Sequence, residues 1–253
     1  MPLRNFILDE LEYVENSLEN NTLNAAPYET LKLVSRYYAQ EGYTKKTIIS
    51  KLEEFLLRCD NTVNLVKWQE VIESLSRNAK KYSLVQINYV TITESELFKI
   101  SQLENKQLKR LMFTLLCLAK FNNQVNSKNN NWTNTKNSDI FKLANVTTTL
   151  ERQGLLINSL YTSGYIKYCN VIDNLNINVT IIDDESKPVL YIKDFRNLGY
   201  QYAKYEGEPY INCENCGLTI RKTSNRLKYC PHCASEINKN NTLFNYKKRQ
   251  LCC

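Results

Sequence analysis

The chain has 253 residues, of which 43% are hydrophobic, and a formal net charge of +7 at pH 7. No apolar run approaches the roughly 20 residues of a membrane-spanning helix, so we expect no such span. The first five residues lack the apolar core of a signal peptide, and we therefore expect a cytoplasmic protein with reduced thiols.

The positive charge falls mainly on the middle and the end of the chain. Residues 1–60 hold more carboxylates than basic side chains, whereas residues 61–204 and 205–253 have a basic surplus. A basic surface suits an acidic partner such as DNA or RNA. The surplus is mild for this length, so it permits such a partner without requiring one.

Residues 1–82 predict a helical bundle. Apolar positions recur at helical spacing in four stretches, residues 5–20, 29–40, 44–56 and 66–80. The second and third helices are joined by a short turn with Gly42, which is the outline of a helix-turn-helix. An ordinary αα-hairpin gives the same pattern, and the acidic balance of this region argues against DNA as its partner.

Residues 83–206 predict a second domain, of the α+β class. The β-branched and aromatic stretch 84–92 predicts a strand, and the capping box at 93–96 begins a helix. A longer helix over 106–121 is apolar around most of its circumference, so we expect it to be buried. The polar, asparagine-rich stretch 122–137 is expected to be a mobile loop.

The centre of this domain has the order of parts found in a winged helix. A short helix over 139–143, capped by a serine, is followed by a compact turn and a capped helix over 148–161. Two strands over 165–172 and 176–182 then form a hairpin. We therefore predict a winged-helix-like domain.

A DNA-binding helix of this kind contacts bases through its first turns. Here those turns carry Thr149, Arg152 and Gln153, which are the candidate base-contacting side chains. Only Arg152 is cationic, and Asp173 at the wing tip would repel a phosphate. Because many winged helices dock on proteins instead, the sequence leaves both kinds of partner open.

A further strand is predicted over 187–193, and Asp194 can cap a helix that continues to Tyr205. Tyrosines are dense in this part of the chain, at Tyr191, Tyr200, Tyr202, Tyr205 and Tyr210. They could stack nucleobases, but a packing surface between the domain and the module that follows is the commoner role of such a cluster.

The last part of the chain, residues 207–253, holds the strongest motif. Two Cys-x-x-Cys pairs are formed by Cys213, Cys216, Cys230 and Cys233. Two such turns supply the four thiolates of a tetrahedral site that leaves no position open for a substrate, so we predict a structural Zn²⁺ ion in a zinc ribbon. Disulfides are the alternative, but they need an oxidising compartment. His232 is redundant as a ligand and is expected at the surface.

Basic side chains accompany the cysteines, at Arg221, Lys222, Arg226 and Lys228, and a basic tail follows at 247–249. They could contact phosphates, or they could offset the negative charge of a metal–tetrathiolate centre. The sequence supports the two roles about equally.

The sequence contains few residues or motifs that indicate catalysis. The chain has one histidine and six glycines, and it lacks the phosphate-binding and nucleophile-elbow motifs. The stretch 183–185 is the one carboxylate cluster that could hold Mg²⁺, but acidic turns after strands are frequent. We therefore expect no catalytic residues and no enzyme activity.

The stretch Lys193-Asp-Phe-Arg-Asn-Leu-Gly199, together with the cysteines from Cys213 to Cys233, resembles uncharacterised phage and mobile-element proteins of low-GC Gram-positive bacteria. Those proteins carry a helical front end, a middle domain and a terminal four-cysteine zinc ribbon. The resemblance implies a role in a phage or mobile element inside a bacterial host cell and no particular activity.

We thus expect a zinc-stabilised nucleic-acid-binding protein that acts in transcription or replication, with DNA preferred to RNA as its partner. The alternative is a protein-interaction module. Such a module would dock on a host machine, such as RNA polymerase or a defence nuclease, and alter its activity.

Overall fold

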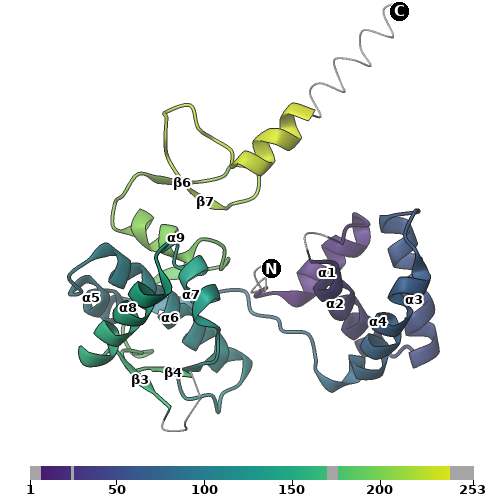
Figure 1. Cartoon of the computed structure of the whole chain (residues 1–253), viewed down its shortest axis with the longest axis horizontal. Helices are drawn as coiled ribbons and strands as arrows, with labels where there is room; N and C mark the ends of the chain where they lie inside the picture. The colour runs from purple at the N-terminus through teal and green to yellow at the C-terminus, as the bar shows by residue number, and fades with distance from the viewer. Residues whose placement is uncertain (1–6, 24–25, 170–175, 240–253) are drawn as a thin grey trace, which may run out of the picture. The chain divides into compact units, whose positions relative to one another are not determined.

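The computed structural model describes residues 7–23, 26–169 and 176–239. The chain divides into two compact units, Met1–Tyr89 and Val90–Cys253 (Figure 1). It is mainly helical with small antiparallel sheets, as predicted. Within the described ranges, no helix has the length and apolarity of a membrane span.

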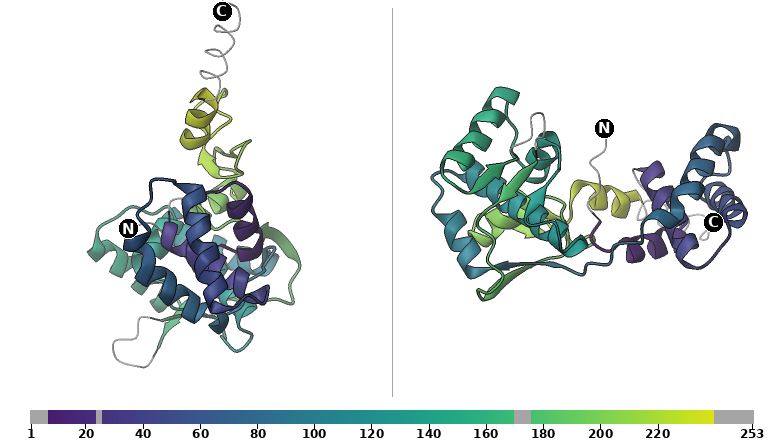
Figure 2. Two further views of the ribbon diagram at one scale, coloured as in Figure 1. Left: turned by 90° about the vertical axis from the view of Figure 1, so that its right-hand side faces the viewer. Right: turned by 90° about the horizontal axis from the view of Figure 1, so that it is seen from below.

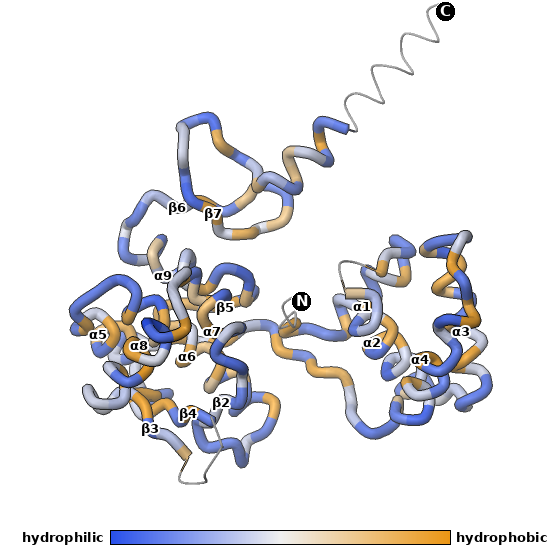
Figure 3. Tube along the Cα trace, in the orientation of Figure 1, coloured by the Kyte–Doolittle hydropathy of each residue, from blue (hydrophilic) through white to orange (hydrophobic). Residues whose placement is uncertain are grey.

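The described part of the first unit consists of amphipathic helices, α1 (Glu10–Glu19), α2 (Pro27–Gln40), α3 (Lys45–Cys59) and α4 (Leu65–Asn78), and a 3-10 turn, η1 (Ala79–Lys81). Apolar and hydrophilic residues alternate along these helices (Figure 3). The apolar side chains share one core, in which Leu31, Leu52 and Phe55 are fully buried. Side-chain caps begin three of these helices: Asp9 accepts the N–H of Glu12, Thr44 that of Thr47 and Asn64 that of Val66.

The second unit is organised around α6 (Lys106–Val125), in which every residue from 111 to 120 is buried, as predicted. The helices that pack on it are α5 (Glu94–Ser101), α7 (Asn137–Leu143), α8 (Leu150–Thr162) and α9 (Leu198–Tyr205). The caps of two of these helices differ from the prediction. Helix α8 is capped by Thr149, not Thr148, because Thr149 accepts the N–H of Arg152. Helix α7 begins one residue before Ser138, which was the predicted cap.

A three-stranded antiparallel sheet covers part of α6. Its strands are β2 (Trp132–Thr133), β3 (Ile166–Tyr168) and β4 (Ile177–Val179), in the order β2-β4-β3. Ile166 pairs with Val179 and Tyr168 with Ile177, so the predicted pairing is confirmed with shorter strands. Asp173 and the basic tail at 247–249 lie outside the described residues.

The strand predicted over 84–92 is largely wrong. Only β1 (Val90–Thr93) joins a sheet, by pairing with β5 (Pro188–Ile192), and the preceding residues make a single bridge between Asp9 and Gln86. A strand extends only as far as its partner does, and β5 ends where Ile192 meets Val90.

The predicted loop over 122–137 is shorter and better anchored than its composition indicates. Its first four residues belong to α6. Beyond them, asparagine amides take the place of backbone partners: Asn123 accepts the N–H of Asn131 at 2.9 Å, and Asn129 donates to the carbonyl of Trp132 at 2.8 Å. A polar composition predicts mobility only where such side chains find no partner.

One ion pair of the second unit is almost completely buried. Glu96 of α5 and Lys120 of α6 have side chains 0% and 5% exposed, and Lys120 Nζ lies 2.8 Å from Glu96 Oε1. The Glu96 carboxylate also accepts the backbone N–H groups of Thr93 and Asp183, and Lys120 contacts Asp184. Both the carboxylate and the ammonium group of the pair therefore have hydrogen-bond partners that offset the cost of their burial.

Helix α9 approaches the turn between α7 and α8 very closely. A Cβ built on Gly199 would lie 1.8 Å from the carbonyl oxygen of Ala144, so only glycine fits there. The predicted cap at Asp194 is wrong, because the helix begins after Asn197, whose φ is 56°. The Asp194 carboxylate instead accepts from Arg196.

We expect Lys120→Met to lower the free energy of unfolding by about 3–5 kcal/mol, because it leaves the Glu96 carboxylate buried without its cation. Urea unfolding followed by circular dichroism measures this. The double variant with Glu96→Gln should recover part of the loss, and the exposed Lys142→Met serves as the control. A decrease in the free energy of unfolding of less than about 1 kcal/mol would contradict a stabilising role of Lys120 beside the buried Glu96 carboxylate.

We expect Gly199→Ala to cost about 3 kcal/mol, because α9 would have to move away from Ala144. Gly154→Ala is the matched control, since its Cβ would meet no atom within 4 Å on an open face of α8 and should stabilise the protein by about 0.5–1 kcal/mol. Equal midpoints of thermal unfolding for the two variants would refute the close packing.

Candidate metal centre

The four cysteines lie on two short turns that face each other. Cys213 and Cys216 connect β6 (Tyr210–Asn212) to β7 (Thr219–Arg221), and Cys230 and Cys233 stand at the start of the helix over 231–239. The strands β6 and β7 lie beside α9 (Figures 1 and 2). Cys213, Cys230 and Cys233 are buried and Cys216 is half-buried.

The sulfur atoms have the spacing of a metal site. All four lie within 4.8 Å of one another, and the Sγ atoms of Cys216 and Cys230 are 3.8 Å apart. A tetrahedral ion with metal–sulfur bonds of about 2.3 Å requires about 3.8 Å between sulfurs, whereas a disulfide requires about 2.05 Å. The four cysteines are therefore positioned to hold a metal ion.

The backbone of the turns is shaped for thiolates. Gly217 has a φ of 72°, as the first turn requires, and its N–H donates to the carbonyl of Cys213 at 2.9 Å. The N–H of Cys230 donates to Cys213 Sγ at 3.2 Å, and Asn215 Nδ2 donates to Cys233 Sγ at 3.3 Å. Such donors orient the ligands and spread their charge.

The same groups favour ionisation of one ligand. Burial raises the pKa of the Cys213 thiol, but backbone N–H groups, led by those of Cys216 and Cys230, outweigh it and lower this pKa to about 6. A thiol with this pKa is largely a thiolate at pH 7, which is the form that binds metal. His232 is exposed, as predicted, and lies outside the cysteine cluster.

The candidate phosphate contacts gather at the end of β7 and on the loop that follows it. Arg221, Lys222, Arg226 and Lys228 are all exposed. Among the described ion pairs, only Lys228 has a partner from this group, Glu214 at 3.4 Å. The structure thus brings these four cations together at the end of β7 and on the loop after it.

The other candidate contacts lie on a separate element. Thr149, Arg152 and Gln153 occupy the amino end of α8, where Arg152 is exposed and Gln153 is half-buried. The outward face of this helix is apolar in part, because Leu150 is 83% and Leu155 57% exposed. Within the described residues of α8, Arg152 is the one cation.

The tyrosine cluster divides into packing and exposed members. Tyr200 and Tyr210 stack with ring centroids 4.7 Å apart, and the Arg110 guanidinium lies 5.7 Å from both centroids. Tyr202 is buried against Phe113. These three tyrosines join α9 and the described part of the four-cysteine module (residues 207–239, the ribbon) to α6, as the packing hypothesis predicts. Tyr191 and Tyr205 are exposed.

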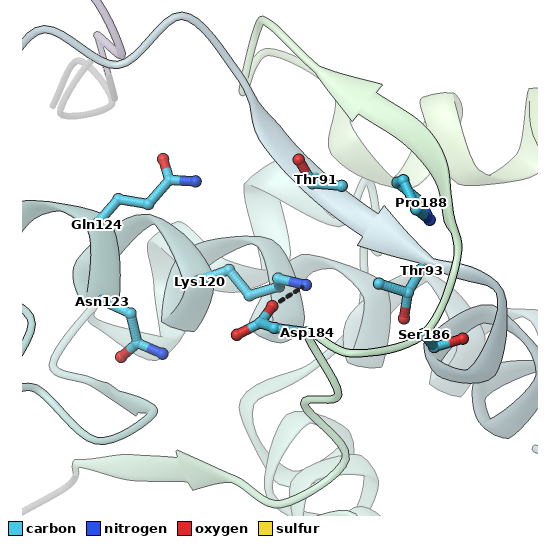
Figure 4. A pocket seen from close by; sticks show the side chains of 8 residues that line it. All are labelled: Thr91, Thr93, Lys120, Asn123, Gln124, Asp184, Ser186 and Pro188. Atoms are coloured by element: carbon cyan, nitrogen blue, oxygen red, sulfur yellow. Dashed lines mark ion pairs between the residues drawn. The ribbon is translucent and has the colours of Figure 1, made fainter.

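A cavity of about 440 Å³ lies between α6, β1 and the segment before β5 (Figure 4). Its walls are mainly polar: Thr91, Thr93, Lys120, Asn123, Gln124, Asp184, Ser186 and Pro188. Lys120 and Asp184 point toward each other at 2.8 Å, so the amine is already paired. Asp183 accepts a hydrogen bond from Ser95, which lowers the pKa of its carboxyl. In the described part of the chain, the carboxylates at 183–185 form no metal-ligating group.

Sequence reasoning missed the contacts that hold the ribbon in place. Arg196 donates to the carbonyl of Cys216, and Asn197 donates to that of Thr219. Both residues lie in the stretch 193–199 that carries the resemblance, but their partners are about twenty positions away and follow no periodic pattern.

Comparisons with protein-family models, curated proteins and solved structures find no match for this chain.

We expect Cys213→Ser and Cys230→Ser each to lose the bound metal, because three thiolates no longer complete the site. Metal content per chain, measured by mass spectrometry after desalting, tests this. Cys59→Ser is the matched control, since Cys59 lies in α3 and outside the cluster. Retention of one metal ion per chain in both ligand variants would contradict the site.

Proposed function

We propose that this chain is a zinc-stabilised nucleic-acid-binding protein, with DNA preferred to RNA. The resemblance to phage and mobile-element proteins motivates a role in their transcription or replication within the host cell. The observation that carries the proposal is the exposed end of β7 with the loop that follows it, where Arg221, Lys222 and Arg226 are exposed and outside every described ion pair. Lys and Arg side chains displayed in this way bind phosphates and release counterions.

The choice of zinc follows from the ligands. Four cysteine sulfurs favour a soft or borderline ion, and Zn²⁺ accepts tetrahedral geometry without preference of its own. A shell filled by thiolates has no place for water or substrate, so the ion would serve folding rather than catalysis. It would fix the loop that presents the cations.

The order of elements in the second unit supports a winged-helix architecture. Helix α6, strand β2, helices α7 and α8, and strands β3 and β4 follow one another, and β4 lies between the other two strands. In this architecture α8 would be the recognition helix, and Arg152 the side chain at its amino end best able to reach a base edge.

A second function is favoured by the outward face of α8. Leu150 and Leu155 are exposed there, and Glu151 beside them is acidic. Such a face suits a protein surface better than a phosphate backbone. The alternative is therefore a module that docks α8 on a host complex such as RNA polymerase.

Fluorescence anisotropy of labelled duplex DNA, single-stranded DNA and RNA with the zinc-loaded chain tests the first proposal. We expect submicromolar binding at low salt, with affinity falling as salt rises. The double variant Arg221→Ala/Arg226→Ala should lower the magnitude of the slope of log K against log salt by about 2, because two phosphate contacts are removed.

Arg77→Ala, an exposed arginine of α4, is the matched control and should leave this slope unchanged. Absence of binding to all three nucleic acids at low salt would refute the proposal. Binding of the chain to purified bacterial RNA polymerase that Leu155→Glu abolishes would then support the alternative.

A further inference from the structure

The segment between β5 and α9 touches the ribbon directly. Arg196 Nη2 donates to the carbonyl oxygen of Cys216 at 2.8 Å, and Asn197 Nδ2 donates to that of Thr219 at 2.9 Å. Cys216 is one of the four ligands, and Thr219 begins β7. Two side chains from outside the ribbon therefore hold its backbone, one at the first cysteine turn and one at the start of β7.

Arg196 is oriented for this contact by Asp194. The Nε of Arg196 donates to Asp194 Oδ2 at 2.7 Å, and the backbone N–H of Arg196 donates to Asp194 Oδ1 at 2.8 Å. The carboxylate holds the Nε–Nη2 edge of the guanidinium, because Nη2 also lies 2.7 Å from Asp194 Oδ2. The Nη2 held in this way is the nitrogen that donates to Cys216. Its positive charge lies next to a centre that four thiolates and a divalent ion would leave negative.

Asn197 connects the ribbon to the turn between α7 and α8. Its Oδ1 accepts from Asn145 Nδ2 at 3.0 Å, and Asn145 Oδ1 accepts the backbone N–H of Tyr200 at 3.2 Å. Asn145 and Asn197 both have positive φ, 53° and 56°. Because Gly199 also packs closely against Ala144, the contacts run without a break from β7 to the residues just after α7.

We propose that Arg196 and Asn197 are positioning residues of the metal centre, and that through them metal binding orders the α7–α8 turn. The inference rests on the proposed zinc site. Neither side chain is a ligand; each fixes backbone that carries or adjoins one. Outer partners of metal ligands typically account for about 10–100-fold in metal affinity. By linkage, a contact that strengthens metal binding is itself strengthened when the metal is bound.

Competition for Zn²⁺ between the full-length protein and a chromophoric chelator tests the role of Arg196. Arg196→Gln should weaken zinc binding about tenfold or more, because both the charge and the donor to Cys216 are lost. Arg196→Lys keeps the charge and should recover part of the affinity. Arg77→Gln is the matched control, since it removes one exposed arginine from α4 in the first unit, and it should bind zinc as the wild type does.

Zinc affinity of Arg196→Gln within twofold of the wild type would overturn the inference and leave the zinc site standing. A wild-type chain with no zinc affinity would overturn the site itself, and the inference with it. The two failures are therefore distinguishable. Circular dichroism of each variant separates lost affinity from lost fold.

Hydrogen–deuterium exchange, measured with and without a zinc chelator, tests the link to the turn. In the wild type, removal of zinc should speed exchange in peptides over 141–150, whereas peptides over 45–59 in the first unit should not change. Asn197→Gly permits the same positive φ but lacks the amide, so zinc removal should no longer affect 141–150. Exchange over 141–150 that is the same with and without zinc in the wild type would refute the coupling.

Discussion

The second unit depends on the pair of Glu96 and Lys120. A buried charge without its partner costs several kcal/mol, so the segments that carry and surround the pair must meet in one arrangement. Those segments are α5, α6, the end of β1 and the chain that follows β4. The pair therefore specifies how the strand pair β1–β5 attaches to the helix that forms the core.

The position of the ribbon follows from that attachment. Strand β5 leads into the segment with Arg196 and Asn197, which contacts the ribbon on one side and the α7–α8 turn on the other. The two surfaces presented by this unit differ in character: the loop after β7 is cationic, whereas the outer face of α8 is partly apolar. The nucleic-acid proposal rests on the first of these surfaces, and the alternative protein-docking proposal rests on the second.

Local chemistry was predictable from the sequence and distant pairing was not. The four cysteines that are positioned to hold a metal ion could be named because each Cys-x-x-Cys turn determines its own geometry. The buried helix α6 could be named because its apolar residues cover its circumference. The strand predicted over 84–92 is longer than β1, because a composition rich in β-forming residues does not show where the partner strand ends. The contacts of Arg196 and Asn197 were missed because isolated polar residues in a loop carry no sign of their partners.

Five asparagines adopt positive φ in the described part of the chain, one more than the glycines that do so. An asparagine in this conformation makes the turn and also offers an amide, which Asn145 and Asn197 use to bridge two parts of the unit. Asparagine is also among the thermolabile residues that hyperthermophilic proteins carry in smaller number. The connection between the ribbon and the rest of the second unit therefore relies on side chains suited to moderate temperatures. Prolonged heating would degrade these asparagines chemically and so weaken the connection.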